Sequence, residues 1–364
     1  MKPKKKLHIL FSVRADLQTK LGGDTQHINY LQKLLKAAGH LVDLAYNHYE
    51  YKVSNYDIVH FFNLSIIDHN YTIFLQAKKD NVKTCFTSIF QNPKLYDPYA
   101  PYSIFIPKFI LEKSKTLLSL SKPSFKTFFK SHYGLRQEFL NQCDQVFCNS
   151  TQEVKDIESY YSLSIQNKST LVIPSIELGK LEDVGDEFVN KFNHKNYLIV
   201  VGRIEKLKNQ VRILKALSDT DITLVFIGVP NYNNKSFYNS FKQLISYNKR
   251  AFYYPELPRK LVLSAIKNAQ LVVQASCVEN FGFVSLEAHY FQTNLLISEN
   301  SYFNSAMKIN YSQVNPYSIE AIKSTILESL ANKKDTKAEH FSELLKIENA
   351  FLANTLSSYL KILS

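Results

Sequence analysis

The sequence has no run of eighteen apolar residues, roughly the length that a membrane-spanning helix requires, so we expect no segment to cross a membrane. It has only four cysteines, and no set of them shows the paired spacing of a zinc site. Each cysteine lies in or beside an apolar, strand-like run, which predicts buried thiols in a reducing cytoplasm. Zinc-finger spacing and the aromatic motif of RNA-binding domains are also missing, which argues against a nucleic-acid-binding protein.

The opening residues resemble a signal peptide only in part. The stretch "MKPKKKLHILFSVRADL" is basic and then apolar, but its apolar part is short and is followed by Arg14 and Asp16 without a small-residue cleavage site. We therefore expect residues 7–13 to form a first buried strand rather than a leader.

Chain length and net charge further limit the number of domains and the kind of partner that we expect. The chain has 364 residues, which is too many for one ordinary α/β domain and suits two. Its net charge of +12 favours a partner that carries negative charge, such as nucleic acid, an anionic lipid surface or a phosphorylated ligand. Composition alone leaves the choice among these three open.

Apolar runs of strand length alternate with amphipathic stretches of helix length. In the first half, the pattern predicts a helix over 24–39, with Asp24 as its cap and Gly39 at its end. Strands that are apolar on both faces and separated by helices favour a parallel sheet covered on both sides. The strands of the first half are expected at 7–13, 41–46, 57–64, 82–90, 143–150 and 169–174.

A second alternation of the same kind begins after a polar, acidic stretch at 174–195, which we interpret as a linker. The sequence therefore predicts an α/β protein with two doubly wound, Rossmann-like domains, residues 1–176 and residues 177–349. The amphipathic end of the chain, 350–364, indicates a final helix. The strands of the second half are expected at 197–202, 222–228, 251–257, 269–276 and 294–300.

Cations follow the first strand of the second half. In "VGRIEKLKNQ" (201–210), Arg203 and Lys208 come directly after an apolar run. Ligands of open parallel sheets bind beyond the carboxyl ends of the strands, so we expect these side chains at a ligand site. The forked donors of arginine and the mobile charge of lysine both suit phosphate oxygens. This segment therefore predicts a site for a diphosphate.

Carboxylates follow a later strand. In "VENFGFVSLE" (278–287), Glu279 and Glu287 are eight residues apart around the start of a predicted helix near Phe281. A helix start binds phosphate through its free N–H groups, and eight helical residues rise about 12 Å. That length matches the reach from a sugar across a diphosphate to a ribose, and carboxylates accept hydrogen bonds from vicinal hydroxyls. The two segments together predict a nucleotide-sugar site.

The segments "GRIEKLKN" and "ENFGFVSLE" resemble the two donor-site signatures of family 4 retaining glycosyltransferases with the GT-B fold. Looser resemblances at 21–44 and 143–157 extend the match over nearly the whole chain. The resemblance implies two Rossmann-like domains facing a central cleft, with the last helix crossing back onto the first domain. It also implies a sugar transferred from a nucleotide-sugar donor to a glycan or lipid-linked acceptor, with retention of anomeric configuration, in surface polysaccharide or glycoconjugate biosynthesis.

The resemblance further implies roles for single residues. Arg203 and Lys208 would bind the donor diphosphate and stabilise the leaving group, so that no metal or other cofactor is needed. Glu279 would contact the transferred sugar, and Glu287 the ribose. Further substrate contacts are expected at the first-domain glycine loop, at a histidine of the helix behind it and at the second-domain helix start: Gly22, Gly23, His27, Asn280, Phe281, Gly282 and Phe283.

This chain departs from the family's pattern in the first domain. Many members have a histidine beyond the fourth strand, but here that stretch reads "TSIFQNPKLYDP". Of the histidines nearby in sequence, we expect His60 to be a packed, hydrogen-bonded residue of a strand. Ser88, Gln91 and Asn92 are candidates to replace the missing side chain in sugar contact. A second departure places Gln292 and Asn294 in a turn where the family has Gly and Pro.

The stretch 101–140 is basic and interleaved with phenylalanines. A basic helix with aromatic anchors lies on an anionic bilayer, which would place the protein peripherally at the inner face of the cell membrane. Alternatively, the phenylalanines pack on the first-domain sheet and the lysines are merely solvated.

Other functions fit the same pattern less well. A catalytically silent binding subunit with the GT-B fold would explain the absent histidine but not the four charged site residues. A nucleotide-sugar epimerase shares the fold, and a phosphorylase would need a cofactor lysine and a longer chain. A nucleic-acid-binding protein would explain the charge but not the paired glutamates.

Overall fold

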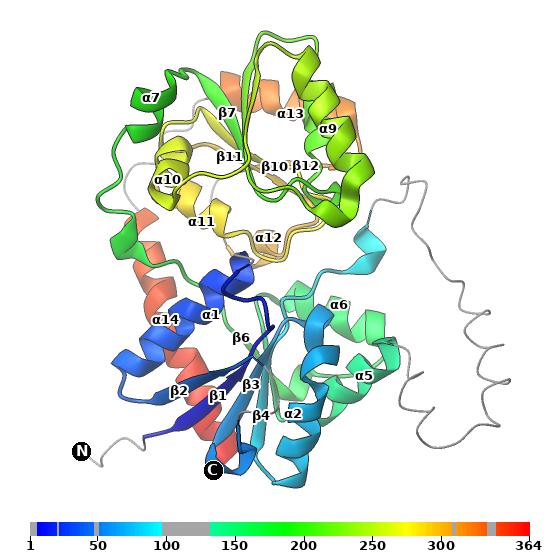
Figure 1. Cartoon of the computed structure of the whole chain (residues 1–364), viewed down its shortest axis with the longest axis vertical. Helices are drawn as coiled ribbons and strands as arrows, with labels where there is room; N and C mark the ends of the chain where they lie inside the picture. Colours follow the sequence, from blue (N-terminus) through cyan, green and yellow to red (C-terminus); the bar gives the residue numbers. More distant parts are fainter. Residues whose placement is uncertain (1–5, 20–21, 47–50, 97–131, 308–310, 333–339) are drawn as a thin grey trace, which may run out of the picture.

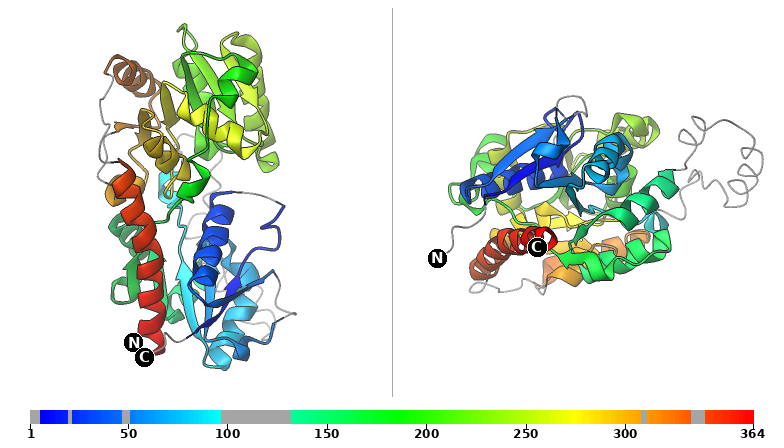
Figure 2. Two further views of the ribbon diagram at one scale, coloured as in Figure 1. Left: turned by 90° about the vertical axis from the view of Figure 1, so that its left-hand side faces the viewer. Right: turned by 90° about the horizontal axis from the view of Figure 1, so that it is seen from below.

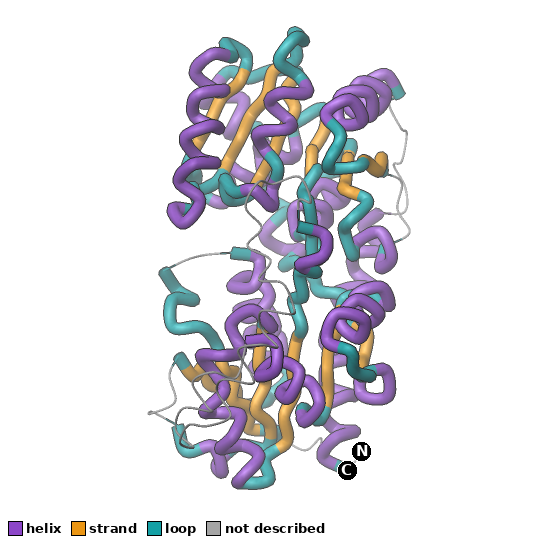
Figure 3. The backbone as a smooth tube through the Cα atoms, turned by 90° about the vertical axis from the view of Figure 1, so that its right-hand side faces the viewer, coloured by secondary structure: helices purple, strands orange, loops and turns teal. Residues whose placement is uncertain are grey.

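A computed structural model gives the fold and describes residues 6–19, 22–46, 51–96, 132–307, 311–332 and 340–364. Two parallel six-stranded sheets form two domains, one above the other in Figure 1. Helices cover both faces of each sheet, as the tube in Figure 3 shows. The predicted α/β class with two Rossmann-like domains is therefore confirmed.

The first sheet has the strand order β2-β1-β3-β4-β5-β6, and all its neighbours pair in parallel. It encloses core residues on both faces because successive side chains of a strand alternate: Leu10 packs on one side of the sheet, and Ile9 and Phe11 on the other. Its strands are β1 (His8–Ser12), β2 (Leu41–Ala45), β3 (Ile58–Phe62), β4 (Lys83–Thr87), β5 (Gln145–Cys148) and β6 (Ser169–Leu171).

The second sheet has the order β12-β11-β10-β7-β8-β9. Five of its strands match the predicted ones, whereas β12 was missed because its sequence, Ser-Gln-Val, is too short and polar to show a pattern. The strands are β7 (Tyr197–Val201), β8 (Thr223–Ile227), β9 (Ala251–Tyr254), β10 (Leu271–Gln274), β11 (Leu295–Ser298) and β12 (Ser312–Val314).

The helices follow the strands in the doubly wound manner. Those of the first half are α1 (Gly23–Ala37), α2 (Ile67–Lys79), α5 (His132–Gln142) and α6 (Thr151–Tyr161). Those of the second half are α7 (Glu187–Phe192), α8 (Gln210–Ala216), α9 (Lys235–Tyr247), α10 (Arg259–Lys267), α11 (Phe283–Tyr290), α12 (Phe303–Ala306), α13 (Ile319–Ala331) and α14 (His340–Leu363).

Two local predictions were wrong. Asp24 is not the cap of α1: the N-cap is Gly22, and the Asp24 carboxylate accepts a hydrogen bond from Arg14 Nε at 2.9 Å. The stretch 174–195 is not simply a polar linker, because it carries α7 and a set of apolar side chains that pack in the second-domain core. These are Leu178, Leu181, Val184 and Phe188.

Helix α14 joins the two domains. It contacts α11 of the second domain and α1, β4 and β6 of the first, and it begins ten residues before the predicted 350. Figure 2 shows α14 running along the first domain, from the boundary with the second domain to the end of the chain. Tyr359 of α14 is fully buried, and its hydroxyl lies 2.5 Å from His60 Nδ1. His60 Nε2 lies 2.8 Å from Thr87 Oγ1, so this histidine is packed and hydrogen-bonded as expected.

Acid should destabilise the packing of α14 on the first domain, because the buried His27 resists protonation in the folded protein. Burial lowers the pKa of His27, which packs against Phe62 and Phe351, to about 4. As pH falls from about 6.5 towards 4, the unfolded chain takes up a proton that the folded one resists, so stability falls by about 1.4 kcal/mol per pH unit for this group. We expect His27→Leu to reduce that slope in denaturation curves measured across this range.

The matched control is Phe351→Leu, which removes packing against the same histidine but no titrating group. Phe351→Leu should lower the free energy of unfolding by the same amount at every pH in this range. Parallel curves for His27→Leu and the wild type would show that His27 does not resist protonation.

Candidate donor site between the domains

Strands β7 and β8 end in two glycines that pack against each other. Gly202 and Gly228 have φ angles of 149° and 150°, which other residues rarely adopt. A Cβ atom at Gly228 would lie 2.2 Å from the Gly202 carbonyl oxygen, so only glycine fits there. The close approach sets the backbone that carries Arg203, and the sequence analysis did not identify Gly228.

Lys208 and Glu279 meet at the carboxyl ends of β7 and β10. The aliphatic part of Lys208 lies over Gly202, and its Nζ is 2.5 Å from Glu279 Oε2. Ser276 Oγ donates to the same carboxylate oxygen at 3.1 Å. Glu279 is buried and Lys208 is about one quarter exposed, so this is a largely desolvated ion pair at the sheet edge.

Arg203, the other predicted cation, is the more exposed of the two. Its Nη2 lies 3.7 Å from Glu205 Oε1, and 58% of its side chain is accessible. Arg203 is thus beside the Lys208–Glu279 pair along the same loop, and its guanidinium faces solvent.

The amides that follow in the same motif carry no charge, and the sequence analysis assigned them no role. Asn209 is buried with a φ of 64°, and its Nδ2 donates to the carbonyl oxygens of Ala275 and Pro316 at 2.9 and 2.6 Å. Gln210 Nε2 donates to the Arg203 carbonyl oxygen at 2.8 Å. The Asn209 bonds tie the cationic loop to the segments after β10 and β12, and the Gln210 bond lies within the loop itself.

Glu287 pairs with a residue that the sequence analysis missed. It lies on α11, is 1% exposed, and its Oε1 accepts a hydrogen bond from Arg259 at the start of α10. Burial raises the pKa of Glu287, and Arg259 opposes that rise. Its Oε2 has no hydrogen-bond partner in the described part of the chain.

The helical spacing expected between the two glutamates was wrong. Helix α11 begins at Phe283, after Gly282 with a φ of 79°, rather than near Phe281. Only about half of the segment from Glu279 to Glu287 is therefore helical, and the helical rise does not set the distance between the two carboxylates.

The phenylalanines of this segment have different surroundings. Phe281 is 2% exposed and packs against Phe303 in the second-domain core, with ring centroids 5.2 Å apart. Phe283 lies at the domain boundary, because a Cβ atom at Gly23 would be 3.3 Å from its ring. The start of α1, with Gly22 as its N-cap, therefore lies against the start of α11.

Asn280 joins the domains through its side chain. Its Nδ2 donates to the Phe90 carbonyl oxygen at 3.0 Å and to Glu153 Oε1 at 2.9 Å, and its Oδ1 accepts from Asn149 Nδ2 at 2.5 Å. Phe90 and Asn149 follow β4 and β5, and Asn280 follows β10. The carboxyl ends of the two sheets therefore face each other.

Glu153 is the buried centre of this contact. It is fully buried on α6, where Ser150 caps the helix by accepting a hydrogen bond from the Glu153 N–H at 3.1 Å. Besides Asn280 Nδ2, its carboxylate accepts bonds from Ser88 Oγ, Phe90 N and Asn149 N. We call Glu153, Asn280 and these three partners the interdomain junction.

The segment after β4, where the family's histidine is absent, takes part in the junction. Ser88 Oγ donates to Glu153, and Asn92 Nδ2 donates to Asp156 at 2.9 Å. Between them, Ile89 has a φ of 40°, a strained conformation for a β-branched residue. Two of the three candidates to replace the histidine, Ser88 and Asn92, are thus engaged in hydrogen bonds to α6.

His27 lies in the first-domain core beneath α14. It is 5% exposed among aromatic rings, and its Nε2 has no partner in the described residues. This placement gives no support for contact with a substrate.

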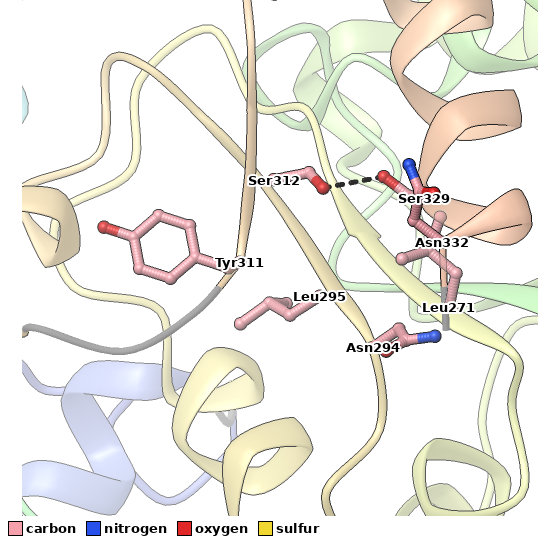
Figure 4. Close-up of a pocket in the computed structure, with 7 residues that line it drawn as sticks. All are labelled: Leu271, Asn294, Leu295, Tyr311, Ser312, Ser329 and Asn332. Atoms are coloured by element: carbon pink, nitrogen blue, oxygen red, sulfur yellow. Dashed lines mark hydrogen bonds between the residues drawn. The ribbon is translucent and has the colours of Figure 1, made fainter. Parts of the chain in front are cut away.

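A shallow pocket shown in Figure 4 lies elsewhere. It is lined by Leu271, Leu295 and Ser312, the first residues of β10, β11 and β12, with Ser329 donating to Ser312 at 2.8 Å. These are the amino ends of the strands, opposite to the ion pairs, and ligands of open parallel sheets bind at carboxyl ends. We therefore assign the pocket no role in donor binding.

An Asp-x-Asp triplet, Asp219-Thr220-Asp221, is also remote from the ion pairs. It precedes β8, and its carboxylates pair with Lys323 at 2.6 Å and Arg250 at 3.1 Å. The described residues contain no group of three or more His, Cys, Asp or Glu side chains arranged to hold a metal ion. Within the same residues, no helix is both long and apolar enough to cross a bilayer.

Known structures share the arrangement of both domains. The chain is similar to a sucrose-phosphate synthase from Thermosynechococcus elongatus, with a TM-score of 0.72 and 14% identity over 98% of this chain and 97% of that one. It is similar to a glycosyltransferase from Rickettsia africae, with a TM-score of 0.68 and 16% identity over 99% of both chains. It is also similar to Anabaena HepE in complex with UDP, with a TM-score of 0.67 and 12% identity over 97% and 100%. No curated protein matches it in sequence.

The fold and the site thus define a protein with the two-domain GT-B architecture. Residues 185–344, which include all four predicted charged residues, match the family model "Glycosyl transferases group 1". The match covers 160 of the 364 residues and supports the predicted glycosyltransferase class.

Removing the Asn280 amide should loosen the junction. In Asn280→Ala, the buried Glu153 loses one of its donors, and Asn149 and the Phe90 carbonyl lose their partner. Leaving such groups unpaired costs about 1–3 kcal/mol, so we expect a lower melting temperature by calorimetry. Asn141→Ala, at an exposed asparagine of α5, is the control and should change stability by less than about 0.5 kcal/mol. Equal melting temperatures for the two variants would contradict a stabilising role for the junction.

Proposed function

We propose that the chain transfers a sugar from a nucleoside diphosphate sugar to a glycan or lipid-linked acceptor, with retention of anomeric configuration. The observation that carries the proposal is the Lys208–Glu279 ion pair at the strand ends that face the first domain. Arg203 adds an exposed cation, and Glu287 adds a carboxylate oxygen that has no partner among the described residues. The name of one similar structure records bound UDP, which agrees with a nucleotide donor.

The ion pair suggests how donor binding prepares the site. Lys208 pairs with Glu279 and compensates its charge. A diphosphate carries more negative charge than one carboxylate, so it competes for the ammonium and frees Glu279 to accept hydrogen bonds from sugar hydroxyls. Ser276 Oγ continues to orient the carboxylate. Glu279 thus holds the transferred sugar, while the cation moves to the diphosphate.

Charge develops on the diphosphate as the bond to the sugar breaks. Lys208 and Arg203 stabilise this leaving group, and the free N–H groups at the start of α11 add positive potential beyond Gly282. Because these groups supply the compensating charge, we expect transfer without a divalent metal. Glu287 binds the ribose through its free oxygen.

Acceptor and cellular role extend the proposal. We propose a place in surface polysaccharide or glycoconjugate biosynthesis, in the cytoplasm. Binding to an anionic membrane surface through 101–140 stays a prediction, because 97–131 lie outside the described residues.

A catalytically silent binding subunit is the second candidate. One observation favours it: Ser88 and Asn92 after β4 are engaged in hydrogen bonds to Glu153 and Asp156 of α6, and this stretch contains no histidine. Such a subunit would bind the nucleotide sugar without transferring the sugar.

Nucleotide binding is tested by a thermal-shift panel of UDP, GDP, CMP and their sugars. A ligand at a hundred times its dissociation constant adds about 2.7 kcal/mol of stability. We expect a shift with one base, and we expect Lys208→Ala to lose it because the diphosphate loses its cation. Lys206→Ala removes an exposed lysine of the same turn and should keep the shift. An undiminished shift in Lys208→Ala would place the diphosphate elsewhere.

Transfer is tested with the sugar of the stabilising nucleotide and an acceptor library, with product anomers assigned by proton NMR. We expect the anomeric configuration of the donor in the product, and a rate lower by about a hundredfold or more in Glu279→Gln, whose amide lacks the charge. An inverted product would exclude retention. Nucleotide binding without any transfer would favour the silent subunit.

A further inference from the structure

The Arg259–Glu287 contact lies outside the residue pairs that the donor signatures predict. Arg259 is the first residue of α10, directly after the loop that follows β9, and its Nη2 donates to Glu287 Oε1. The arginine side chain is 43% exposed and the glutamate side chain 1% exposed. A half-exposed cation therefore reaches an otherwise enclosed carboxylate.

The second carboxylate oxygen has a different environment. Glu287 Oε2 is buried and has no hydrogen-bond partner in the described residues. An ionised carboxylate in such a place is costly unless it is paired and its oxygens accept hydrogen bonds. A ligand hydroxyl that donates to Oε2 would supply the missing bond.

Arg259 is the charge that acts on Glu287. Burial raises the pKa of the Glu287 carboxyl, and the single opposing influence on it comes from Arg259. The other charged groups around α11 are engaged elsewhere. His289 of α11 lies 3.5 Å from Glu343 of α14, and Lys260 of α10 lies 2.8 Å from Glu187 of α7.

We propose that Arg259 is a positioning residue of the donor site, which engages one oxygen of Glu287 so that the other accepts a hydroxyl of the donor's ribose. This inference rests on the proposed function, because the ribose is the ligand that the proposal places at Glu287. Arg259 thereby makes the site selective for a nucleotide with a ribose over one with a deoxyribose.

The geometry gives the arginine a specific part in this selectivity. A guanidinium is always charged and offers several donors in a fixed plane, so it can hold one carboxylate oxygen and leave the other free. Without it, the buried carboxyl would take up a proton at a higher pH. The protonated carboxyl accepts hydrogen bonds more weakly, so ribose binding would become sensitive to pH.

The test measures dissociation constants by calorimetry for UDP or GDP, whichever stabilises the wild type, and for the 2′-deoxy and 3′-deoxy forms, from acidic to mildly basic pH. The variants are Arg259→Ala, Arg259→Gln and Arg259→Lys. Lys260→Ala is the matched control. It removes a positive charge from the same helical turn, but Lys260 pairs with Glu187 and not with Glu287. Melting temperatures show whether each variant folds.

We expect the wild type and Lys260→Ala to prefer the ribose form by about tenfold, the effect of one hydrogen bond to a charged group. Arg259→Ala and Arg259→Gln should lose most of this preference. The pH below which affinity falls should also move upwards in these two variants, because the carboxylate is the binding form and its pKa rises. Arg259→Lys should keep the pH profile close to that of the wild type.

A merely structural role would change stability but move neither the ribose preference nor the pH profile. If Arg259→Ala does not fold, Arg259→Gln serves the same comparison, since it keeps a donor and removes the charge. The inference is overturned if the folded variants match Lys260→Ala in both measurements. A wild type that binds no nucleotide would overturn the proposed function and this inference together, whereas wild-type binding with unaltered Arg259 variants would overturn this inference alone.

Discussion

A buried carboxylate shared between the domains fixes the arrangement on which the donor site depends. Glu153 is fully enclosed, and such a group is stable only if hydrogen bonds compensate for its lost hydration. Three of its donors come from the first domain, and Asn280 supplies the fourth from the second. Since Asn280 is next to Glu279, the same bond that stabilises the domain contact holds the donor-site loop. The strained Ile89 persists because the bonds on both sides of it fix the turn.

The candidate donor site contains two glutamates, each paired with its own cation. Lys208 holds Glu279, and Arg259 holds Glu287. Both glutamates are buried, so removing the cation of either pair would be costly unless a ligand supplied a new partner. A nucleotide sugar carries both kinds of group: a diphosphate anion for the lysine and hydroxyls for the carboxylates. The two pairs therefore match the class of ligand that we propose for this site.

The sequence predicted the fold because its evidence is local. Parallel strands are buried on both faces, so each one reads as a short apolar run, and the order of runs and helices indicates doubly wound domains. The charged residues at strand ends were found for the same reason, since a residue that follows a strand must lie at the sheet's edge. Strand β12 was not predicted because three residues are too few to show an alternating pattern. Asp24 was misread as a cap because its competing partner, Arg14, lies ten residues away in another loop.

By itself, the sequence determined the two sheets and placed the charged residues of the two predicted donor signatures at the ends of strands. Only the tertiary structure decided which of those charges meet. Arg259 and Glu287 are 28 residues apart, and Asn280 and Glu153 are 127 apart. Their contacts depend on how helices and loops pack across the sheets and between the domains. A periodic pattern states which face of an element is buried, but it contains no information on which distant side chain is buried against it.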